Sequence, residues 1–217
     1  MPRPERLVVA MGTATDVGKT WVGAQVLQRL RSDGVAMGAR KPVQSFEPGA
    51  GPTDADVLAQ ATGEAPTEVC PTHRWYEVAM APPMAAEALG LASFTLADLV
   101  DELSWPRPTA VGWVETVGGP RSPVAADADS AALAAAVEPD LVVLVADAGL
   151  GAINAVLLCV AVLPPPVVVV LNRFDGSDLH RRNRDWLIGT GAGAGAGVDV
   201  VDVDQLAALL RSSLQVR

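Results

Sequence analysis

The chain has 217 residues, half of them hydrophobic, yet aromatic side chains make up only 4% of it. Acidic residues outnumber basic ones by 25 to 16, and the resulting net charge of −9 argues against proteins that bind nucleic acid or anionic membranes through a basic face. Two cysteines are too few for a disulfide framework, so a reducing compartment fits. We expect one domain over residues 1–217, with a core of small aliphatic side chains.

The chain shows no sequence pattern of a secretory signal or a membrane span. Its first residues lead into an apolar stretch of five residues at 7–11, which is shorter than the apolar region of a signal peptide. The most apolar stretch, 156–171, is interrupted by three prolines, whereas a spanning helix needs ~20 uninterrupted apolar residues. We therefore expect a soluble, cytoplasmic protein.

Short apolar runs alternate with longer helical patterns along the chain. This alternation predicts βαβ units, that is, an α/β fold with a mostly parallel sheet and helices on both faces. In the first half, strands are predicted at 7–11, 36–41 and 111–115, helices at 19–31, 54–62, 84–89 and 96–103, and an irregular segment at 65–83. In the second half, strands are predicted at 141–146, 167–171 and 199–202, and helices at 129–137, 152–163, 179–188 and 205–214.

A Gly/Ala stretch at 189–197 (GTGAGAGAG) precedes the last two predicted elements. Its composition is typical of a flexible connector or a mobile loop. Only 20 residues follow it, enough for one strand and one helix, so we predict that it does not separate two domains.

The strongest motif is GTATDVGKT at 12–20, which follows the first predicted strand and opens the first predicted helix. Glycine lets a backbone approach a phosphate, and amides at a helix N-terminus attract the same anion. Lys19 can reach the outer phosphates and the Thr20 hydroxyl can bind Mg²⁺. The motif has five residues between its glycines where the usual P-loop has four, but its GKT end and its strand–loop–helix context are intact. We predict a nucleoside triphosphate site formed by Gly12, Thr13, Ala14, Thr15, Asp16, Val17, Gly18, Lys19 and Thr20.

Two carboxylates stand where a phosphate-transfer site needs a metal anchor. Glu115 is at the carboxyl end of a predicted strand, where open α/β sheets bind their ligands. Asp54 opens a short helix, and together with Thr20 the two carboxylates suit Mg²⁺, a hard cation. Asp54 could instead be an N-cap or first-turn residue, and Asp56 is an alternative ligand.

Lys41 ends the second predicted strand and precedes Pro42, which fixes the backbone beyond it. A lysine at this point could neutralise charge on a transferring phosphoryl group or on an anionic substrate. The alternative is a strand-end lysine that reaches solvent.

Together these segments resemble dethiobiotin synthetases. The similarity covers residues 7 to about 172, with the segments in family order and at family spacing. The matching segments are GTxTxVGKT at 12–20, KPVQS at 41–45, Asp54-Ala55-x-x-Leu58, Ala81-Pro82-Pro83, Glu115-x-x-Gly118-Gly119 and Leu150-Gly151-x-x-Asn154.

The resemblance implies a P-loop fold with about seven strands, a homodimer, and the use of ATP and Mg²⁺. In that family 7,8-diaminononanoate takes up CO₂ on one amine and forms a carbamate, whose oxygen attacks the γ-phosphate of ATP. The second amine then displaces phosphate from the carbamic–phosphoric anhydride and closes the cyclic urea, dethiobiotin. The implied partners are therefore small molecules, a diamino acid and CO₂.

The resemblance also implies roles for individual residues. Lys19, Lys41 and Thr15 would be catalytic, with Lys19 on the phosphates and Lys41 on the carbamate and the transferring phosphoryl group. Thr20, Asp54 and Glu115 would hold Mg²⁺. Asn172 would meet the adenine edge, or else be an ordinary asparagine in a turn. The substrate would be bound by Thr15, Lys41, Ser45, Gly118, Gly119 and the helix start Gly151, Ala152, Ile153 and Asn154, the last four receiving its carboxylate from the neighbouring subunit.

The sequence departs from the family after Glu115. Thr116 stands where the family has glycine, and PRSP at 120–123 replaces an apolar continuation. Arg121 could bind phosphate or a substrate carboxylate, or lie in solvent. Two alternatives follow: a paralogue that activates the carbamate of another diamine, and a nucleotide switch that acts through a protein partner. Neither Thr13 nor Ala14 is the second lysine that a dimerising switch often carries.

Overall fold

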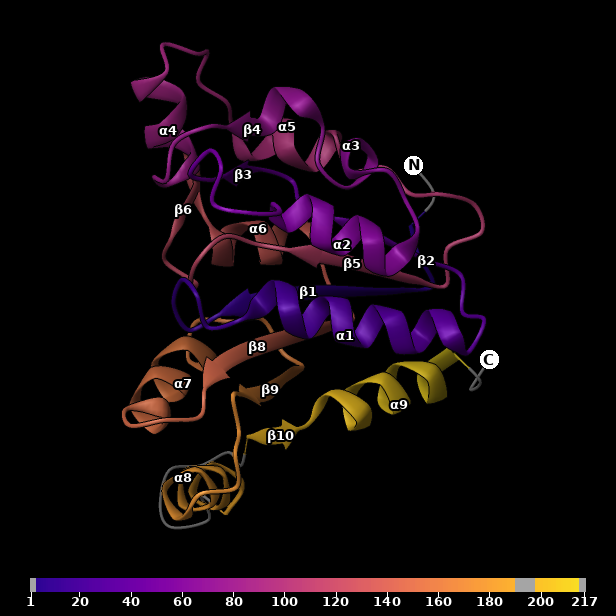
Figure 1. Cartoon of the computed structure of the whole chain (residues 1–217), viewed down its shortest axis with the longest axis vertical. Helices are drawn as coiled ribbons and strands as arrows, with labels where there is room; N and C mark the ends of the chain where they lie inside the picture. Colours follow the sequence, from indigo (N-terminus) through magenta and orange to yellow (C-terminus); the bar gives the residue numbers. More distant parts are fainter. Residues whose placement is uncertain (1–2, 190–197, 215–217) are drawn as a thin grey trace.

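The computed structural model describes residues 3–189 and 198–214. Its centre is a sheet of six parallel strands in the order β10-β9-β8-β1-β5-β2 (Figure 1). The predicted parallel sheet is confirmed, but six strands pair in the described part of the chain, not about seven. The strands are β1 (Arg6–Gly12), β2 (Met37–Arg40), β5 (Val111–Glu115), β8 (Leu141–Asp147), β9 (Val167–Asn172) and β10 (Asp199–Val201).

Both faces of the sheet are buried, as the apolar runs of the strands predict. In β1, Val8 and Ala10 join one core while Leu7, Val9 and Met11 join the other, because side chains alternate along a strand. The first core includes α1 (Lys19–Ser32), α2 (Asp54–Thr62), α3 (Pro66–Val69) and α9 (Val203–Leu214). The second includes α4 (Pro82–Ala88), α5 (Leu96–Asp101), α6 (Ser130–Val137), α7 (Ala152–Val160) and α8 (Asp178–Ile188).

All predicted helices are present, with ends that differ by a few residues. Small elements that the sequence did not predict complete the fold. They are the parallel pair β3 (Gln44–Ser45) and β4 (Trp75–Tyr76), the antiparallel pair β6 (Pro123–Ala125) and β7 (Ala128–Asp129), and, within the segment 65–83 predicted as irregular, the short helix α3 and a 3₁₀ turn at Thr72–Arg74. The predicted Gly/Ala connector lies outside the described residues except for Gly189, which ends α8.

The carboxyl ends of the parallel strands meet at the left edge of the sheet in Figure 1, where β1 leads through a loop into α1. The loops that follow β1, β5 and β2 are therefore brought together at this edge.

No helix within residues 3–189 and 198–214 is both long and apolar enough to cross a membrane.

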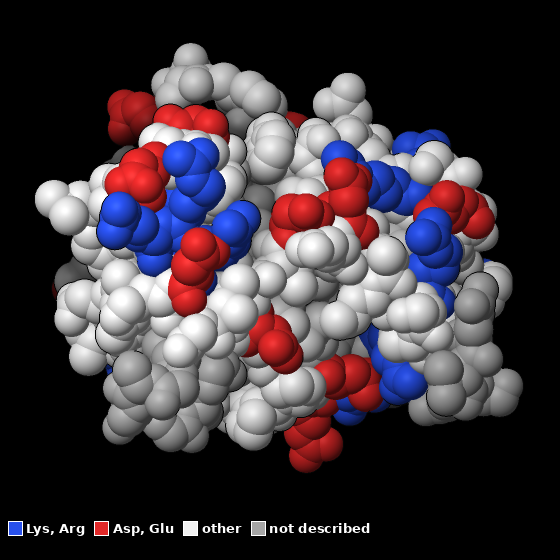
Figure 2. Space-filling model, turned by 90° about the horizontal axis from the view of Figure 1, so that it is seen from below, with Lys and Arg blue, Asp and Glu red and all other residues white. Residues whose placement is uncertain are grey.

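Positive and negative side chains are interspersed on the face seen from below in Figure 2. Helix α8 carries several arginines, and two of them form ion pairs along the helix itself. Arg182 lies 2.7 Å from Asp178, and Arg184 lies 2.7 Å from Asp185. The arginine-rich segment of α8 is thus an exposed helix face with paired charges.

Gly23 lets α1 approach the sheet closely. A Cβ atom at this position would lie 2.9 Å from Nε1 of Trp113, whose side chain is fully buried. Alanine favours a helix over glycine by about 1 kcal/mol, but a buried indole ring cannot give way without moving the core. We expect Gly23→Ala to destabilise the protein by about 1–3 kcal/mol in urea unfolding.

The control Gln28→Ala, on the exposed face of α1, should change stability by less than about 0.5 kcal/mol. Unchanged stability in Gly23→Ala would contradict this packing argument.

Candidate nucleotide- and metal-binding site

The loop between β1 and α1 is fixed at its base and open along its length. Gly12 donates its amide to Gly118 O at 3.1 Å, and Thr13 donates to Val145 O at 2.8 Å. By contrast, the amides at 14–18 donate to no other residue of the described chain. Gly18 has φ +91°, and a Cβ there would lie 2.0 Å from Asn172 Nδ2, so only glycine fits. Free amides beside a helix N-terminus form an anion site.

Lys19 is the first residue of α1 and is only 8% exposed. Its side chain forms no hydrogen bond or ion pair with other described residues. Burial lowers the pKa of Lys19, and the nearby charge of Lys41 lowers it further. A buried cation without a partner is costly, so this lysine favours an anionic ligand.

Three oxygen-bearing side chains converge beside this loop. Thr20 Oγ1 lies 2.7 Å from Asp54 Oδ1 and 2.9 Å from Glu115 Oε1. A hydroxyl has one hydrogen, so Thr20 can donate to only one of these two carboxylates at a time. The close approach of all three oxygen atoms is the arrangement expected of ligands that converge on a cation. Asp56, the alternative ligand, does not line the cavity beside these groups, and its carboxylate accepts from Thr53 N at 2.8 Å in the capping box of α2.

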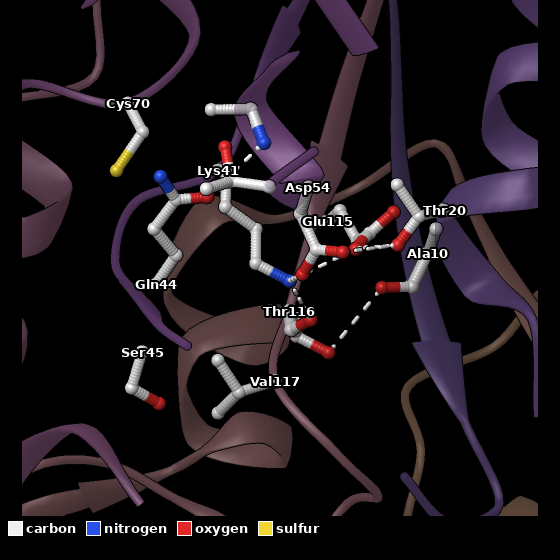
Figure 3. Close-up of polar contacts among 12 residues, drawn as sticks. Ala10, Thr20, Lys41, Gln44, Ser45, Asp54, Cys70, Glu115, Thr116 and Val117 are labelled. Carbon is white, nitrogen blue, oxygen red and sulfur yellow. Dashed lines mark hydrogen bonds and ion pairs between the residues drawn. The ribbon is translucent and has the colours of Figure 1, made fainter. Parts of the chain in front are cut away.

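Lys41 lies within this cluster (Figure 3) and is buried. The alternative prediction, a strand-end lysine that reaches solvent, is therefore wrong. Its Nζ lies 2.7 Å from Asp54 Oδ2 and 2.8 Å from Glu115 Oε1, and it donates to Thr116 O at 3.1 Å. Burial acts to lower the pKa of Lys41, but the two carboxylates outweigh this and raise it. The lysine therefore stays protonated.

The pKa values of the two carboxylates that pair with Lys41 shift in opposite directions. Burial alone would raise the pKa of Asp54, but the Lys41 ammonium outweighs this effect and lowers it to about 2. Burial raises the pKa of Glu115, and the charge of Lys41 opposes that rise.

The donor set fits Mg²⁺. Thr20, Asp54 and Glu115 offer a hydroxyl and two carboxylates, and Glu115 Oε2 is buried without a hydrogen-bond partner in the described structure. Within the described ranges no three His, Cys, Asp or Glu side chains form a metal-binding group. Mg²⁺ is typically held by one or two carboxylates together with substrate phosphates, which agrees with this set.

A cavity of about 840 Å³ lies beside these groups, and the fully buried Glu115 is the one side chain of the Lys–Asp–Glu cluster that does not line it. Of the residues predicted for the site, Thr15, Asp16, Gly18, Lys19, Thr20, Lys41, Ser45, Asp54 and Gly118 line it. Its wall also contains Arg173 and Ser122, which sequence reasoning did not assign to the site. The signal for Arg173 was its place directly after Asn172, at the carboxyl end of a predicted strand.

Other predicted residues lie outside this cavity. Asn172 uses its Nδ2 to donate to Val17 O at 2.9 Å, so at least one edge of its amide holds the loop. Gly119 packs against Thr13 O. The helix start predicted to bind a carboxylate lies elsewhere on the same subunit: none of Gly151, Ala152, Ile153 and Asn154 lines the cavity.

The family departures are divided: Ser122 and Pro123 of the PRSP segment line the cavity, whereas Thr116 and Arg121 do not. The Thr116 side chain is buried and its Oγ1 lies 3.3 Å from Ala10 O in β1, so it faces the sheet. Arg121 is exposed and pairs with Asp129 at 2.9 Å, which matches the solvent reading.

The fold and the site define a P-loop α/β protein with a phosphate-binding loop beside a Lys–Asp–Glu cluster. Residues 6–195 match the model of a P-loop family described as AAA domain. The ATP-dependent dethiobiotin synthetase BioD of Caulobacter vibrioides is 35% identical over 77% of this chain and 80% of its own length. That of Aquifex aeolicus is 30% identical over 84% and 83%. This chain belongs to the dethiobiotin synthetase family.

The similar solved structures support the fold of this chain and nothing beyond the fold, because their sequence identity is low. The chain matches the signal recognition particle receptor FtsY of Elizabethkingia anophelis with GDP at TM-score 0.50 and 17% identity, over 92% of this chain. It matches the chloroplast FtsY of Physcomitrella patens at TM-score 0.50 and 16% identity, over 97% of this chain. The chain spans only 57% and 66% of those two chains.

Proposed function

We propose that this chain is an ATP- and Mg²⁺-dependent dethiobiotin synthetase, acting as one domain over residues 1–217 in the cytoplasm. It would convert 7,8-diaminononanoate, CO₂ and ATP to dethiobiotin, ADP and phosphate in biotin biosynthesis. The observation that carries the proposal is the cavity lined by the phosphate loop, Lys19, Lys41 and Asp54, with the buried Glu115 in contact with Lys41 and Thr20. The family relatives support the same activity.

The nucleotide half of the site binds and orients the triphosphate. The free amides of the loop and the ammonium group of Lys19 would bind the phosphates at the start of α1. Thr20, Asp54 and Glu115 would hold Mg²⁺, which neutralises phosphate charge when bound.

The substrate half would position a carbamate next to that triphosphate. One amine adds to CO₂ and loses a proton, and the carbamate oxygen then bonds to the γ-phosphorus as ADP leaves. The second amine attacks the carbamate carbon, loses a proton and releases phosphate. Lys41, held protonated by its two carboxylates, would stabilise the carbamate and the transferring phosphoryl group. Thr15 and Ser45 would contact the diamine end, with Val117 and Pro82 along its aliphatic chain.

The test is ATP-dependent phosphate release with Mg²⁺ and bicarbonate, with and without 7,8-diaminononanoate, and mass detection of dethiobiotin. Turnover that needs both the diamine and bicarbonate is the expected result. Turnover with another diamine only would favour the paralogue, which is supported by Ser122 and Pro123 in the cavity wall but not by Thr116 or Arg121, neither of which lines the cavity. ATP binding without diamine-stimulated turnover would contradict the proposal.

We further propose that the enzyme is a homodimer whose interface includes α7. Leu150, before this helix, is 93% exposed, and Leu158 on its outer face is 66% exposed. Asn154 is also exposed, and it does not line the cavity of its own subunit. A second copy would cover the apolar residues and bring this helix start to the substrate carboxylate of its partner.

We expect Asn154→Ala to raise the KM for the diamine about tenfold and to leave kcat within about twofold, because one hydrogen bond to a charged group is lost from binding. Steady-state kinetics measures the change in KM. Sedimentation velocity of the Leu158→Glu variant tests whether α7 lies in the dimer interface. A monomeric wild type, or an unchanged KM in Asn154→Ala, would contradict the shared site.

A further inference from the structure

Two adjacent residues at the carboxyl end of β9 contact backbone carbonyl groups of the phosphate loop. Asn172 Nδ2 donates to Val17 O at 2.9 Å, and Arg173 Nη2 donates to Asp16 O at 2.6 Å. The two acceptors are consecutive carbonyl groups of the loop. We call Asn172 and Arg173 the carbonyl clamp.

The geometry of the peptide bond gives these contacts a consequence for anion binding. In a trans peptide the C=O and the following N–H point in opposite directions. Donors that hold the carbonyls of Asp16 and Val17 therefore turn the amides of Val17 and Gly18 away from the clamp. These amides belong to the loop segment whose N–H groups donate to no other described residue.

We propose that the carbonyl clamp is a positioning device that holds the phosphate-binding amides in their binding orientation before the nucleotide arrives. Arg173 and Asn172 act through the loop, so they are positioning residues in this role. The inference rests on the proposed nucleotide site, but it is independent of which diamine is the substrate.

The backbone around the clamp is held in an unfavourable conformation. Arg173 has φ +57° and Asp16 has φ +58°, and these are two of the three non-glycine residues with positive φ in the described chain. Such residues are energetically unfavourable, and they persist only where surrounding contacts fix them. Here the two strained residues bond directly to one another.

Asp147 fixes the other end of the Arg173 side chain. Arg173 Nη1 lies 2.7 Å from Asp147 Oδ2, at the end of β8, and this hydrogen bond lowers the pKa of Asp147. Asp147 Oδ1 in turn accepts from Gly149 N at 2.9 Å. The arginine thus links the ends of β8 and β9 to the loop that follows β1, three neighbouring strands of the sheet.

The test compares two probes, ATP and inorganic tripolyphosphate, each with Mg²⁺ and without diamine, by isothermal titration calorimetry. We expect Arg173→Ala to weaken both about tenfold, because a charge-assisted hydrogen bond to the loop is lost. Arg173→Lys keeps the charge and one donor group, so it should recover part of the affinity. Asn172→Asp places an oxygen against Val17 O and should also weaken both probes.

The matched control is Arg182→Ala, an exposed arginine paired within α8, which should bind both probes as the wild type does. Thermal unfolding of each variant checks that the fold is intact. The loss should persist between about 0.05 M and about 0.5 M KCl, since a contact effect is screened less than a long-range charge effect.

Three results would overturn the clamp. Binding of both probes within about twofold of the wild type in Arg173→Ala would show that the loop needs no such support, because twofold is below the effect of one lost hydrogen bond. Weakened ATP binding with unchanged tripolyphosphate binding would show that Arg173 contacts the nucleoside and does not support the loop. A loss that disappears at high salt would reduce Arg173 to a general positive charge. Failure of the diamine assay with intact clamp effects would contradict the proposed reaction and not the clamp.

Discussion

Replacing Lys41 with alanine is expected to lower kcat for dethiobiotin formation by about 10³-fold, the largest effect of any single substitution in this site. The ammonium group of Lys41 is buried between Asp54 and Glu115 and borders the cavity. Of the two lysines that line the cavity, Lys41 is the one held in place by two carboxylates, so it would stabilise charge that develops there during phosphoryl transfer. Removing it also leaves two neighbouring carboxylates without their shared counter-charge.

The measurement is steady-state product formation by mass detection, together with ATP binding and thermal unfolding of the variant. The adjacent substitution Arg40→Lys serves as control, because Arg40 pairs with Glu64 at 2.7 Å and does not line the cavity. Its kcat should stay within about twofold of the wild type, as expected for a residue outside the reacting groups. A folded Lys41→Ala enzyme that keeps more than about a tenth of the wild-type kcat would remove Lys41 from catalysis.

The second large effect is expected for Glu115→Gln. The substitution keeps the size of the side chain but removes the charge of a fully buried carboxylate that touches Thr20 and Lys41. A neutral amide is a poorer ligand for a hard cation, so we expect the Mg²⁺ concentration for half-maximal activity to rise about 100-fold. Part of the lost activity should return at high Mg²⁺.

A titration of activity against Mg²⁺ measures this change. Glu64→Gln is the matched control, since Glu64 is also a largely buried, ion-paired carboxylate but pairs with Arg40, apart from Thr20 and Lys41. That control should lose stability, because breaking a buried pair leaves Arg40 uncompensated, while its Mg²⁺ dependence stays that of the wild type. Identical Mg²⁺ curves for Glu115→Gln and the wild type would exclude Glu115 as a ligand.

Local patterns in the sequence were sufficient for the elements that depend on near neighbours. The six strands of the sheet and the principal helices follow from apolar runs and helical periodicity, which are properties of short segments. The phosphate loop could be recognised because its function needs glycines, a lysine and a threonine at fixed spacing along one stretch of chain. The start of α2 is equally local, since Thr53 and Asp56 form its capping box within three residues.

The environment of each predicted site residue was decided by the tertiary structure. Lys41 and Glu115 are 74 positions apart, and no local pattern indicates that one will be buried against the other. The same is true of Asn172, which reaches Val17 across 155 positions, and of Thr116, whose side chain faces β1 and not the cavity. The small β3–β4 and β6–β7 pairs were missed because strands of two or three residues carry too little periodicity to be recognised.

By itself, then, the sequence determined the parallel α/β class, the phosphate loop and the residue types available for the chemistry, because these are written in contiguous segments. Only the tertiary structure decided which of those residues share a cavity, which carboxylates hold Lys41 protonated, and which side chains support the loop from outside. These properties depend on how the ends of separate strands are brought together at one edge of the sheet, and burial and charge pairing exist only after the strands have assembled.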